Sequence, residues 1–278
     1  MDKSNLLVHV AYNNKSEVEM VKRLAVSYDL KYHRVPIDKS TFDTADYIKY
    51  AKLVVIWNGM QQSGPLVTNL CKIRNIPTVY IEWGLLPQST TYLVDPKGFT
   101  GNSILCEDIS WVNEEDLLKL YETRLDLQEK YPLSDRGYVL VPLQIENDTQ
   151  ILQYTKYRNM DEFVRDIEYM YPNNRIIVKS HPKSRAKRNF NKAVMSTEPD
   201  FLKLASQASI VVGLTSTTLC EAAILGKPVV SLGEHALNKN DLRDRDKVLA
   251  GMLALNLDRK TGNMRSILDR FNYKLAVY

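Results

Sequence analysis

The strongest structural signal in this sequence is the alternation of short apolar runs with longer amphipathic segments. The apolar runs are rich in Val and Ile and have the length of buried strands, whereas the other segments place apolar residues on one side of a helix. Strands are predicted at residues 6–11, 31–37, 52–57, 78–82, 138–143, 175–179, 209–212 and 228–232. Helices are predicted at residues 16–28, 65–74, 114–130, 159–170, 200–207 and 217–225. This alternation favours parallel sheets built from βαβ units.

The pattern restarts after the helix predicted at residues 114–130. The stretch KYPLSDRG, residues 130–137, brings Pro, Ser, Asp and Gly together and is typical of a linker. With 278 residues, of which 44% are hydrophobic, the chain is long enough for two cores. We therefore predict an α/β fold with two Rossmann-like domains facing one another across a cleft. Their predicted bounds are residues 1–132 and 133–278.

Charge and cysteine usage narrow the class of protein. The net charge of +4 is mild and does not suggest a nucleic-acid binder. Cys71, Cys106 and Cys220 are far apart and form no CxxC pair, which predicts free thiols in a reducing compartment. The first apolar run is too short for a signal peptide, and no stretch approaches the roughly 18 apolar residues of a membrane span. We expect a cytoplasmic protein.

Polar side chains follow several predicted strands at the point where each strand ends. The stretch LVPLQIENDTQI changes from a buried strand into amides and carboxylates that include Asp148. Glu82, His181 and the segment 213–218 follow three other strands in the same way. If the strands are parallel, these residues lie at the carboxyl ends of sheets, where open α/β folds bind their ligands.

The segment VVGLTSTTLCEAAILGKPVVSLG predicts a phosphate site. Gly213 allows a tight turn, and a hydroxyl among residues 215–218 can cap the next helix, with Glu221 three residues after Thr218 as in a capping box. Free N–H groups at a helix start, together with hydroxyls, suit a phosphate. A purely structural helix cap is an equally good interpretation of the hydroxyls alone.

His181 lies in IIVKSHPKS, directly after a predicted strand and before a proline that disfavours helix. No second His or Cys stands at ligand spacing, so we expect an anion contact rather than a metal ligand. A histidine in an ordinary surface loop is the alternative. The basic residues around His181 favour a nearby phosphate, although most of them are expected to be solvated. They also leave open a peripheral contact with an anionic inner membrane. They are Lys179, Lys183, Arg185, Lys187 and Arg188.

Other motifs give weaker or negative signals. The DxD pattern at residues 244–246 binds divalent metal in some sugar-nucleotide enzymes, but here it lies inside a segment, 238–252, that is predicted to be a helix with its charges outward. The chain has no GxGxxG after its first strand, no Walker A motif and no GxSxG. Gly59 and Gly64 follow the third strand and suggest a loop that comes close to a ligand or to the other domain, although a plain loop is the simpler interpretation.

The motifs VPLQIENDTQI, VKSHP and GLTSTTLCEAAILGKPVVSLG, in this order and spacing, resemble the bacterial capsule-polysaccharide synthesis proteins and the related retaining β-Kdo glycosyltransferases (Kdo is 3-deoxy-D-manno-oct-2-ulosonic acid). The stretches EWGLLPQ and KGFTGNS are also similar. The resemblance covers residues 79–233. It implies a glycosyltransferase-B fold, CMP-β-Kdo as the donor, a glycan or lipid-linked glycan as the acceptor, and no cofactor or metal.

The resemblance also implies roles for individual residues. His181 and Ser216 would hold the CMP phosphate, Asp148 would lie beneath the anomeric carbon, and Glu82 would act on the acceptor side as general base. Gln144 and Asn102 would contact the donor sugar. The full set of implied donor-binding residues is Lys179, His181, Pro182, Thr215, Ser216, Thr217, Thr218, Glu221, Gln144 and Asn102.

Three other functions compete with a Kdo transferase. A CMP-sialic acid-dependent sialyltransferase would use similar phosphate-binding elements. A non-hydrolysing sugar-nucleotide epimerase would share the two-domain architecture but act on a UDP-sugar. A non-catalytic nucleotide-binding or scaffold protein would not need the complete set of Glu82, Asp148, His181 and Ser216.

Overall fold

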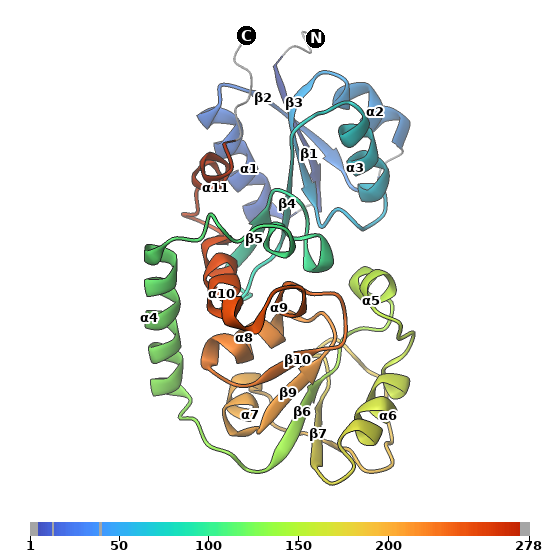
Figure 1. Cartoon of the computed structure of the whole chain (residues 1–278). Coiled ribbons are helices and arrows are strands. Elements are labelled where there is room, and N and C mark those ends of the chain that lie inside the picture. Colours follow the sequence, from blue (N-terminus) through green and yellow to red (C-terminus); the bar gives the residue numbers. More distant parts are fainter. Residues whose placement is uncertain (1–4, 13, 39–40, 273–278) are drawn as a thin grey trace. The chain divides into compact units, whose positions relative to one another are not determined.

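The computed structural model describes residues 5–12, 14–38 and 41–272 (Figure 1). The chain divides into two compact units, which are described one at a time. Unit 1 comprises Met1–Trp111 and Ala254–Tyr278, and unit 2 comprises Val112–Leu253. The predicted boundary after residue 132 differs from this division in two places. The helix α4 (Glu114–Lys130) is part of unit 2, and the C-terminal segment is part of unit 1.

The described residues of unit 1 form a six-stranded sheet in the order β11-β5-β4-β3-β1-β2. Its strands are β1 (Leu6–Ala11), β2 (Lys31–Pro36), β3 (Ala51–Trp57), β4 (Thr78–Trp83), β5 (Thr91–Asp95) and β11 (Asn256–Asp258). The first four are parallel, whereas β5 is antiparallel to β4, and β11 is antiparallel to β5. The helices are α1 (Lys15–Ser27), α2 (Thr41–Ile48), α3 (Gly64–Ile73) and α11 (Met264–Arg270), with 3-10 turns η1 (Thr100–Asn102) and η2 (Ile104–Cys106).

Unit 2 has a five-stranded sheet in the order β10-β9-β6-β7-β8, and every pair in it is parallel. The strands are β6 (Tyr138–Pro142), β7 (Arg175–Lys179), β8 (Val194–Met195), β9 (Ile210–Gly213) and β10 (Val229–Ser231). Besides α4, the helical elements are α5 (Thr149–Tyr154), α6 (Met160–Met170), α7 (Phe201–Gln207), α8 (Thr217–Leu225), α9 (Ala236–Lys239), η3 (Leu242–Asp244) and α10 (Arg245–Ala254). Figure 1 shows α6 on one side of this sheet and α7 and α8 on the other.

The core of unit 2 explains why these sequences adopt these elements. Residues that alternate along β6, such as Val139 and Val141, pack against Phe163, Val164 and Ile167 on the apolar face of α6. All of these side chains are fully buried, and each contributes about 1.5–3 kcal/mol of hydrophobic free energy. The charged residues of α6 lie away from this face, except Glu168, which is buried and accepts hydrogen bonds from Lys192 N and Ala193 N. This packing fixes the register of β6 and therefore the position of the loop that follows it.

The prediction of an α/β chain is confirmed, but three local predictions are wrong. The strand at 228–232 is not the last one, because β11 follows it and pairs with β5. The sheet of unit 1 is mixed rather than wholly parallel. The helix predicted at 238–252 is interrupted between α9 and α10, because the Asp241 carboxylate accepts a hydrogen bond from Arg243 N and starts a separate 3-10 turn.

Candidate functional site

The carboxyl edge of the unit 2 sheet collects the polar residues that the sequence singled out. Because β6, β7, β9 and β10 are parallel, their carboxyl ends lie at one edge, with Pro142 opposite Lys179 and Gly213 opposite Ser231. The loops that leave this edge carry the largest part of the predicted set. Together with the first turn of α8, they contain Gln144, Asp148, His181, Pro182, Thr215, Ser216, Thr217 and Thr218.

Asp148 caps the short helix α5. The strand β6 ends at Pro142, the chain turns, and Asp148 Oδ1 accepts a hydrogen bond from Gln150 N at 3.0 Å. The side chain is half-buried, and Oδ2 has no hydrogen-bond donor among the described residues. The polar cluster that ends LVPLQIENDTQI is therefore a helix cap that also presents one carboxylate oxygen at the sheet edge.

His181 has a defined tautomer. Its Nδ1 accepts a hydrogen bond from Lys183 N at 3.1 Å, so in the neutral ring the proton is on Nε2. Partial burial lowers the pKa of His181, and the Lys183 charge lowers it further, whereas the negative charge of Asp148 acts in the opposite direction. Asp148 and His181 are thus electrostatic neighbours, and the neutral imidazole offers Nε2–H as a donor.

Gln144 forms hydrogen bonds with the loop between β9 and α8. Thr215 N donates to Gln144 Oε1 at 3.0 Å, and Gln144 Nε2 donates to Thr215 Oγ1 at 3.1 Å. Both residues are buried. Gln144, for which the resemblance implied a donor-sugar contact, thus joins the loop after β6 to the loop after β9.

Ser216, rather than Thr218, is the N-cap of α8. Its Oγ accepts hydrogen bonds from Thr218 N at 3.3 Å and from Thr218 Oγ1 at 2.8 Å. The predicted capping box of Thr218 with Glu221 is therefore wrong, because the helix begins earlier than that pairing requires. With its lone pairs in use, Ser216 still has its own hydroxyl hydrogen to donate.

Glu221 lies one turn inside α8. Burial raises its pKa to about 7, and the negative charge of Asp200 adds to the increase. Lys179, at the end of β7, is half-buried, and Pro182 is exposed. The edge therefore combines a carboxylate, an imidazole, hydroxyls and a second carboxyl group that gains and loses its proton near neutral pH.

A buried arginine that the sequence did not reveal connects two of these loops. Arg188 Nη2 donates to Glu146 Oε1 at 2.7 Å, and Arg188 Nη1 donates to Asp161 Oδ1 at 2.7 Å. Glu146 Oε1 also accepts from Met160 N at 3.0 Å. The Arg188 side chain is only 7% exposed. The prediction that most basic residues here are solvated holds for Lys183, Arg185 and Lys187 but is wrong for Arg188.

We expect Arg188→Met to destabilise this edge by about 1–2 kcal/mol, because it leaves two partly exposed carboxylates without their shared partner. Hydrogen exchange of peptides covering residues 143–150 and 180–193 would measure the loss as faster exchange in both. Lys187→Met is the matched control, since an exposed neighbouring cation should change stability by less than about 0.5 kcal/mol. Equal exchange in the two variants would show that the Arg188 clamp contributes nothing.

Glu82 and Asn102 lie in unit 1, and the structure relates neither of them to the edge of unit 2. Asn58 Nδ2 donates to Glu82 Oε2, and Asn58 Oδ1 accepts from Met60 N at 3.1 Å, which fixes the orientation of the amide. Asn58 is buried and has a positive φ of 58°. Asn58 was not among the site residues predicted from the sequence. It nevertheless comes directly after an apolar strand, which is the signal that identified Glu82.

The loop 58–64 and the loop after β5 are both closely packed. A Cβ on Gly59 would meet the Tyr80 ring at 2.7 Å, so this loop packs closely against β4. Asp95 organises the segment that carries Asn102, accepting from Lys97 N at 2.7 Å and Ser103 Oγ at 2.7 Å. Burial raises the pKa of Asp95 to about 6 although these hydrogen bonds lower it.

The part of the chain that the structure describes contains neither a metal-binding cluster nor a membrane-spanning helix. There, no group of three or more His, Cys, Asp and Glu side chains is arranged to hold a metal ion. In the DxD pattern, Asp246 Oδ1 accepts from Arg124 Nη2 at 2.7 Å. None of the described helices has the length and apolar character needed to cross a bilayer. Cys71 and Cys220 are buried free thiols, and Cys106 is half-buried.

An open groove of about 600 Å³ lies beside the sheet edge in unit 2. It is formed by the end of α5 and the loop from β10 into α9, and its lining includes Thr155, Gly233 and Asn238. A Cβ on Gly233 would approach Thr215 Cγ2 to 2.6 Å, so the groove wall packs directly on the β9–α8 loop. Its volume is within the range of small-molecule sites.

These features define unit 2 as an open α/β unit with polar side chains gathered at the carboxyl edge of its sheet. Residues 119–250 match the family model described as capsule polysaccharide biosynthesis protein. This match, over just under half of the chain, agrees with the resemblance that the sequence motifs carry. The matched segment contains Asp148, His181 and Ser216 but neither Glu82 nor Asn102.

Two further comparisons extend the likeness. Protein FixF of Sinorhizobium fredii is 24% identical over 260 residues, which are 86% of this chain and 59% of FixF. The β-Kdo 2,7 transferase structure of Thermosulfurimonas dismutans KpsC has a TM-score of 0.67 at 17% identity, covering 98% of this chain and 100% of that chain. The β-Kdo 2,4 transferase structure of KpsC gives a TM-score of 0.64 at 17% identity, covering 95% and 97%. These structures establish the fold that the chain shares with them.

Proposed function

We propose that the chain is a retaining glycosyltransferase that moves β-Kdo from CMP-β-Kdo to a glycan acceptor during synthesis of a bacterial capsule or lipopolysaccharide. The observation that carries the proposal is the meeting of Asp148, His181 and Ser216 at one sheet edge. The family match supports a role in surface polysaccharide, and the likeness to two β-Kdo transferases supports the donor. The chain spans 59% of FixF, so the proposal concerns this chain alone.

In this proposal the edge of unit 2 binds the CMP phosphate without a metal. His181 Nε2–H, the Ser216 hydroxyl and the Thr217 N–H at the start of α8 donate to the phosphate oxygens. Thr215, Thr217 and Thr218 shape the loop, and Lys179, Pro182 and Gln144 border it. The nucleoside occupies the groove beside Gly233. The donor binds best when the Glu221 carboxyl group is protonated, because a negative charge on Glu221 would repel the phosphate.

The reacting carbon would lie above Asp148. Departure of CMP breaks the bond between the Kdo anomeric carbon and the phosphate oxygen, and the transition state is oxocarbenium-like. The Asp148 carboxylate either stabilises this positive charge or bonds to the carbon to give a covalent adduct. In the covalent route, attack by Asp148 and then by the acceptor hydroxyl inverts the centre twice, which gives net retention.

Unit 1 would serve the acceptor. Glu82, held by Asn58, accepts the proton of the attacking hydroxyl as general base. Asn102, on the loop organised by Asp95, contacts the donor sugar.

Three basic residues of unit 2, Lys183, Arg185 and Lys187, are exposed and would hold a cytoplasmic enzyme near the anionic inner membrane.

The test is to incubate the protein with CMP-Kdo, generated in situ, and a panel of Kdo-terminated and hexose-terminated glycans. We expect CMP release that depends on an acceptor and is unchanged by EDTA, and a product whose NMR spectrum reports a β-Kdo linkage. Parallel reactions contain CMP-sialic acid or a single UDP-sugar. Transfer of sialic acid instead of Kdo, or epimerisation of the UDP-sugar, would replace the proposal, and no turnover of any donor would favour a binding protein.

A further inference from the structure

We propose that Tyr12 is a carbohydrate-stacking residue, which holds a sugar ring of the acceptor at the carboxyl end of β1 in unit 1. The inference rests on the proposed function, because it assigns the acceptor side of that reaction. It starts from an aromatic cluster at the sheet edge. Tyr12 stacks on Trp57 with ring centroids 5.0 Å apart at 22°, and the Tyr12 and Trp83 centroids lie 6.1 Å apart in an edge-to-face arrangement. Tyr92 completes the cluster behind the two tryptophans.

Within this cluster Tyr12 is the most exposed ring. Trp57 and Tyr92 are at most 1% exposed, whereas Tyr12 is 49% exposed. Trp83 is covered on one side by the Arg259 guanidinium, 4.5 Å from its ring centre, and Arg259 also donates to the backbone carbonyls of Gln88 and Thr91. Tyr12 is therefore supported on one face by a buried indole, while about half of the residue is exposed.

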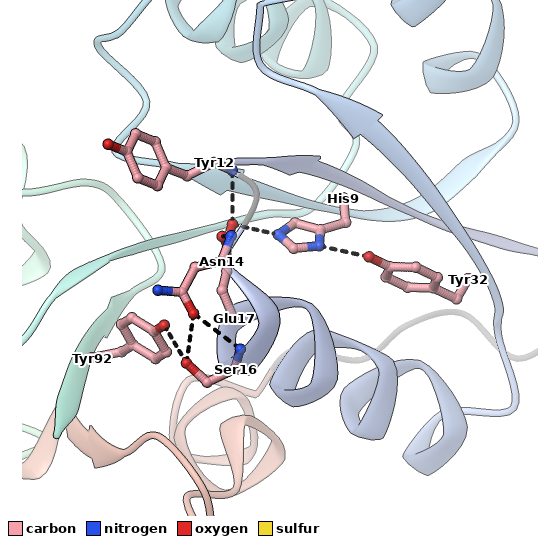
Figure 2. Close-up of polar contacts among 7 residues, drawn as sticks. All are labelled: His9, Tyr12, Asn14, Ser16, Glu17, Tyr32 and Tyr92. Atoms are coloured by element: carbon pink, nitrogen blue, oxygen red, sulfur yellow. Dashed lines mark hydrogen bonds and ion pairs between the residues drawn. The ribbon is translucent and has the colours of Figure 1, made fainter.

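Buried polar side chains fix the backbone that carries this ring (Figure 2). Glu17 Oε1 accepts from Tyr12 N at 3.1 Å, and Glu17 Oε2 accepts from Asn14 N at 3.3 Å. His9 Nε2 lies 2.9 Å from Glu17 Oε1, and His9 Nδ1 lies 2.9 Å from the Tyr32 hydroxyl. His9 and Glu17 are both 0% exposed.

Hydrogen bonds also fix Asn14, the N-cap of α1. Asn14 Oδ1 accepts from Ser16 N at 3.0 Å and from the Ser16 hydroxyl at 2.7 Å, and Ser16 Oγ lies 2.7 Å from the Tyr92 hydroxyl. In Figure 2 the Tyr12 ring points away from this bonded cluster. A half-exposed ring whose backbone N–H is already held by a buried carboxylate loses little conformational entropy when a ligand binds, which favours recognition.

The chemistry of the site fits a sugar ring. The C–H groups on one face of a pyranose carry partial positive charge and match the negative face of an aromatic ring. Trp83 is adjacent in the chain to Glu82, the proposed base, and consecutive Cα atoms are about 3.8 Å apart. Side chains alternate across a strand, so the aromatic cluster and the carboxylate belong to opposite faces of β4 at the same end. A glycan lying over this edge can contact both.

Three variants test the inference, with binding measured by saturation-transfer difference NMR of the acceptor glycans and, separately, of CMP. Tyr12→Leu keeps apolar cover over Trp57 but removes the ring, and we expect glycan affinity to fall about ten-fold. Tyr12→Trp should retain binding. Tyr169→Ala, which removes an 87% exposed tyrosine in unit 2, is the matched control and should change nothing.

The readouts separate this inference from the proposed function. If the wild type transfers Kdo, Tyr12→Leu should raise the acceptor KM about ten-fold and leave the donor KM unchanged. An unchanged acceptor KM would overturn the role of Tyr12 while the transferase activity stands. If the wild type transfers nothing, loss of glycan signals in Tyr12→Leu still supports the stacking site. Absence of glycan binding by the wild type, or loss of CMP signals instead, would overturn it.

Discussion

Asp148→Asn is expected to lower Kdo transfer by about a thousand-fold while the protein remains folded. The large effect follows because the substitution removes the negative charge that stabilises, or bonds to, the anomeric carbon. The fold should survive because asparagine is as good an N-cap as aspartate, so the bond from Gln150 N to the side-chain oxygen is kept. Acceptor-dependent CMP release under saturating donor measures kcat, and hydrogen exchange over α5 checks the cap.

Further variants at this position separate the charge from the cap. Asp148→Ser keeps an N-cap acceptor and should be as inactive as Asp148→Asn. Asp148→Ala should add a loss of about 1 kcal/mol of stability, because it removes the cap as well. Asp241→Asn makes the same chemical change at the N-cap of η3 and should leave transfer unchanged. Near-normal turnover by Asp148→Ala would rule out the covalent route and any electrostatic role of this carboxylate.

Elements whose signal is local were predictable from the sequence. The strands β1 and β7 and the helices α4 and α8 have the predicted bounds, because each combines a clear apolar period with turn or capping residues at its ends. The common edge of Asp148, His181 and Ser216 was also predictable. Each residue follows a strand, and neighbouring strands need only be parallel for these residues to lie at one edge.

Features that depend on distant partners were not predictable. The strand β5 is short, and its pairing with β11 joins Leu93 to Asn256 across most of the chain. Arg188 appears in the sequence as one more cation in a basic run, and its partner Glu146 is 42 residues away. The capping box failed for a different reason, since four consecutive residues could each cap α8, and only the bond from Thr218 N to Ser216 Oγ distinguishes them.

His235→Asn is expected to make unit 2 more resistant to mild acid. His235 is 2% exposed, its Nδ1 accepts from Leu237 N at 3.1 Å as the N-cap of α9, and its Nε2 lies 3.6 Å from Cys220 Sγ. Burial lowers the pKa of His235 to about 4, whereas a histidine in the unfolded chain has a pKa of about 6.5. The unfolded state therefore binds a proton between these pH values that the folded state does not.

The stability contributed by neutral His235 is present above pH ~6.5 and is lost as the pH falls toward about 4. The total loss is about 3 kcal/mol, of which about 2 kcal/mol falls between pH 7 and pH 5. Asparagine can still accept from Leu237 N but cannot be protonated, so His235→Asn should lack this loss. Asp95 and Glu221, whose pKa values are raised, contribute stability in the opposite direction, but they do so equally in both proteins.

The measurement must report on unit 2 itself. The three tryptophans, Trp57, Trp83 and Trp111, lie in unit 1, so their fluorescence would follow the other unit. Hydrogen exchange of peptides from α8, at pH 7 and pH 5 with rates corrected for intrinsic exchange, gives the free energy of opening directly. Asn238→Ala is the matched control, because it weakens the same cap but keeps the imidazole and should therefore keep the full pH dependence. An equal loss between pH 7 and pH 5 in His235→Asn and in the wild type would mean that another group governs the acid sensitivity of this unit.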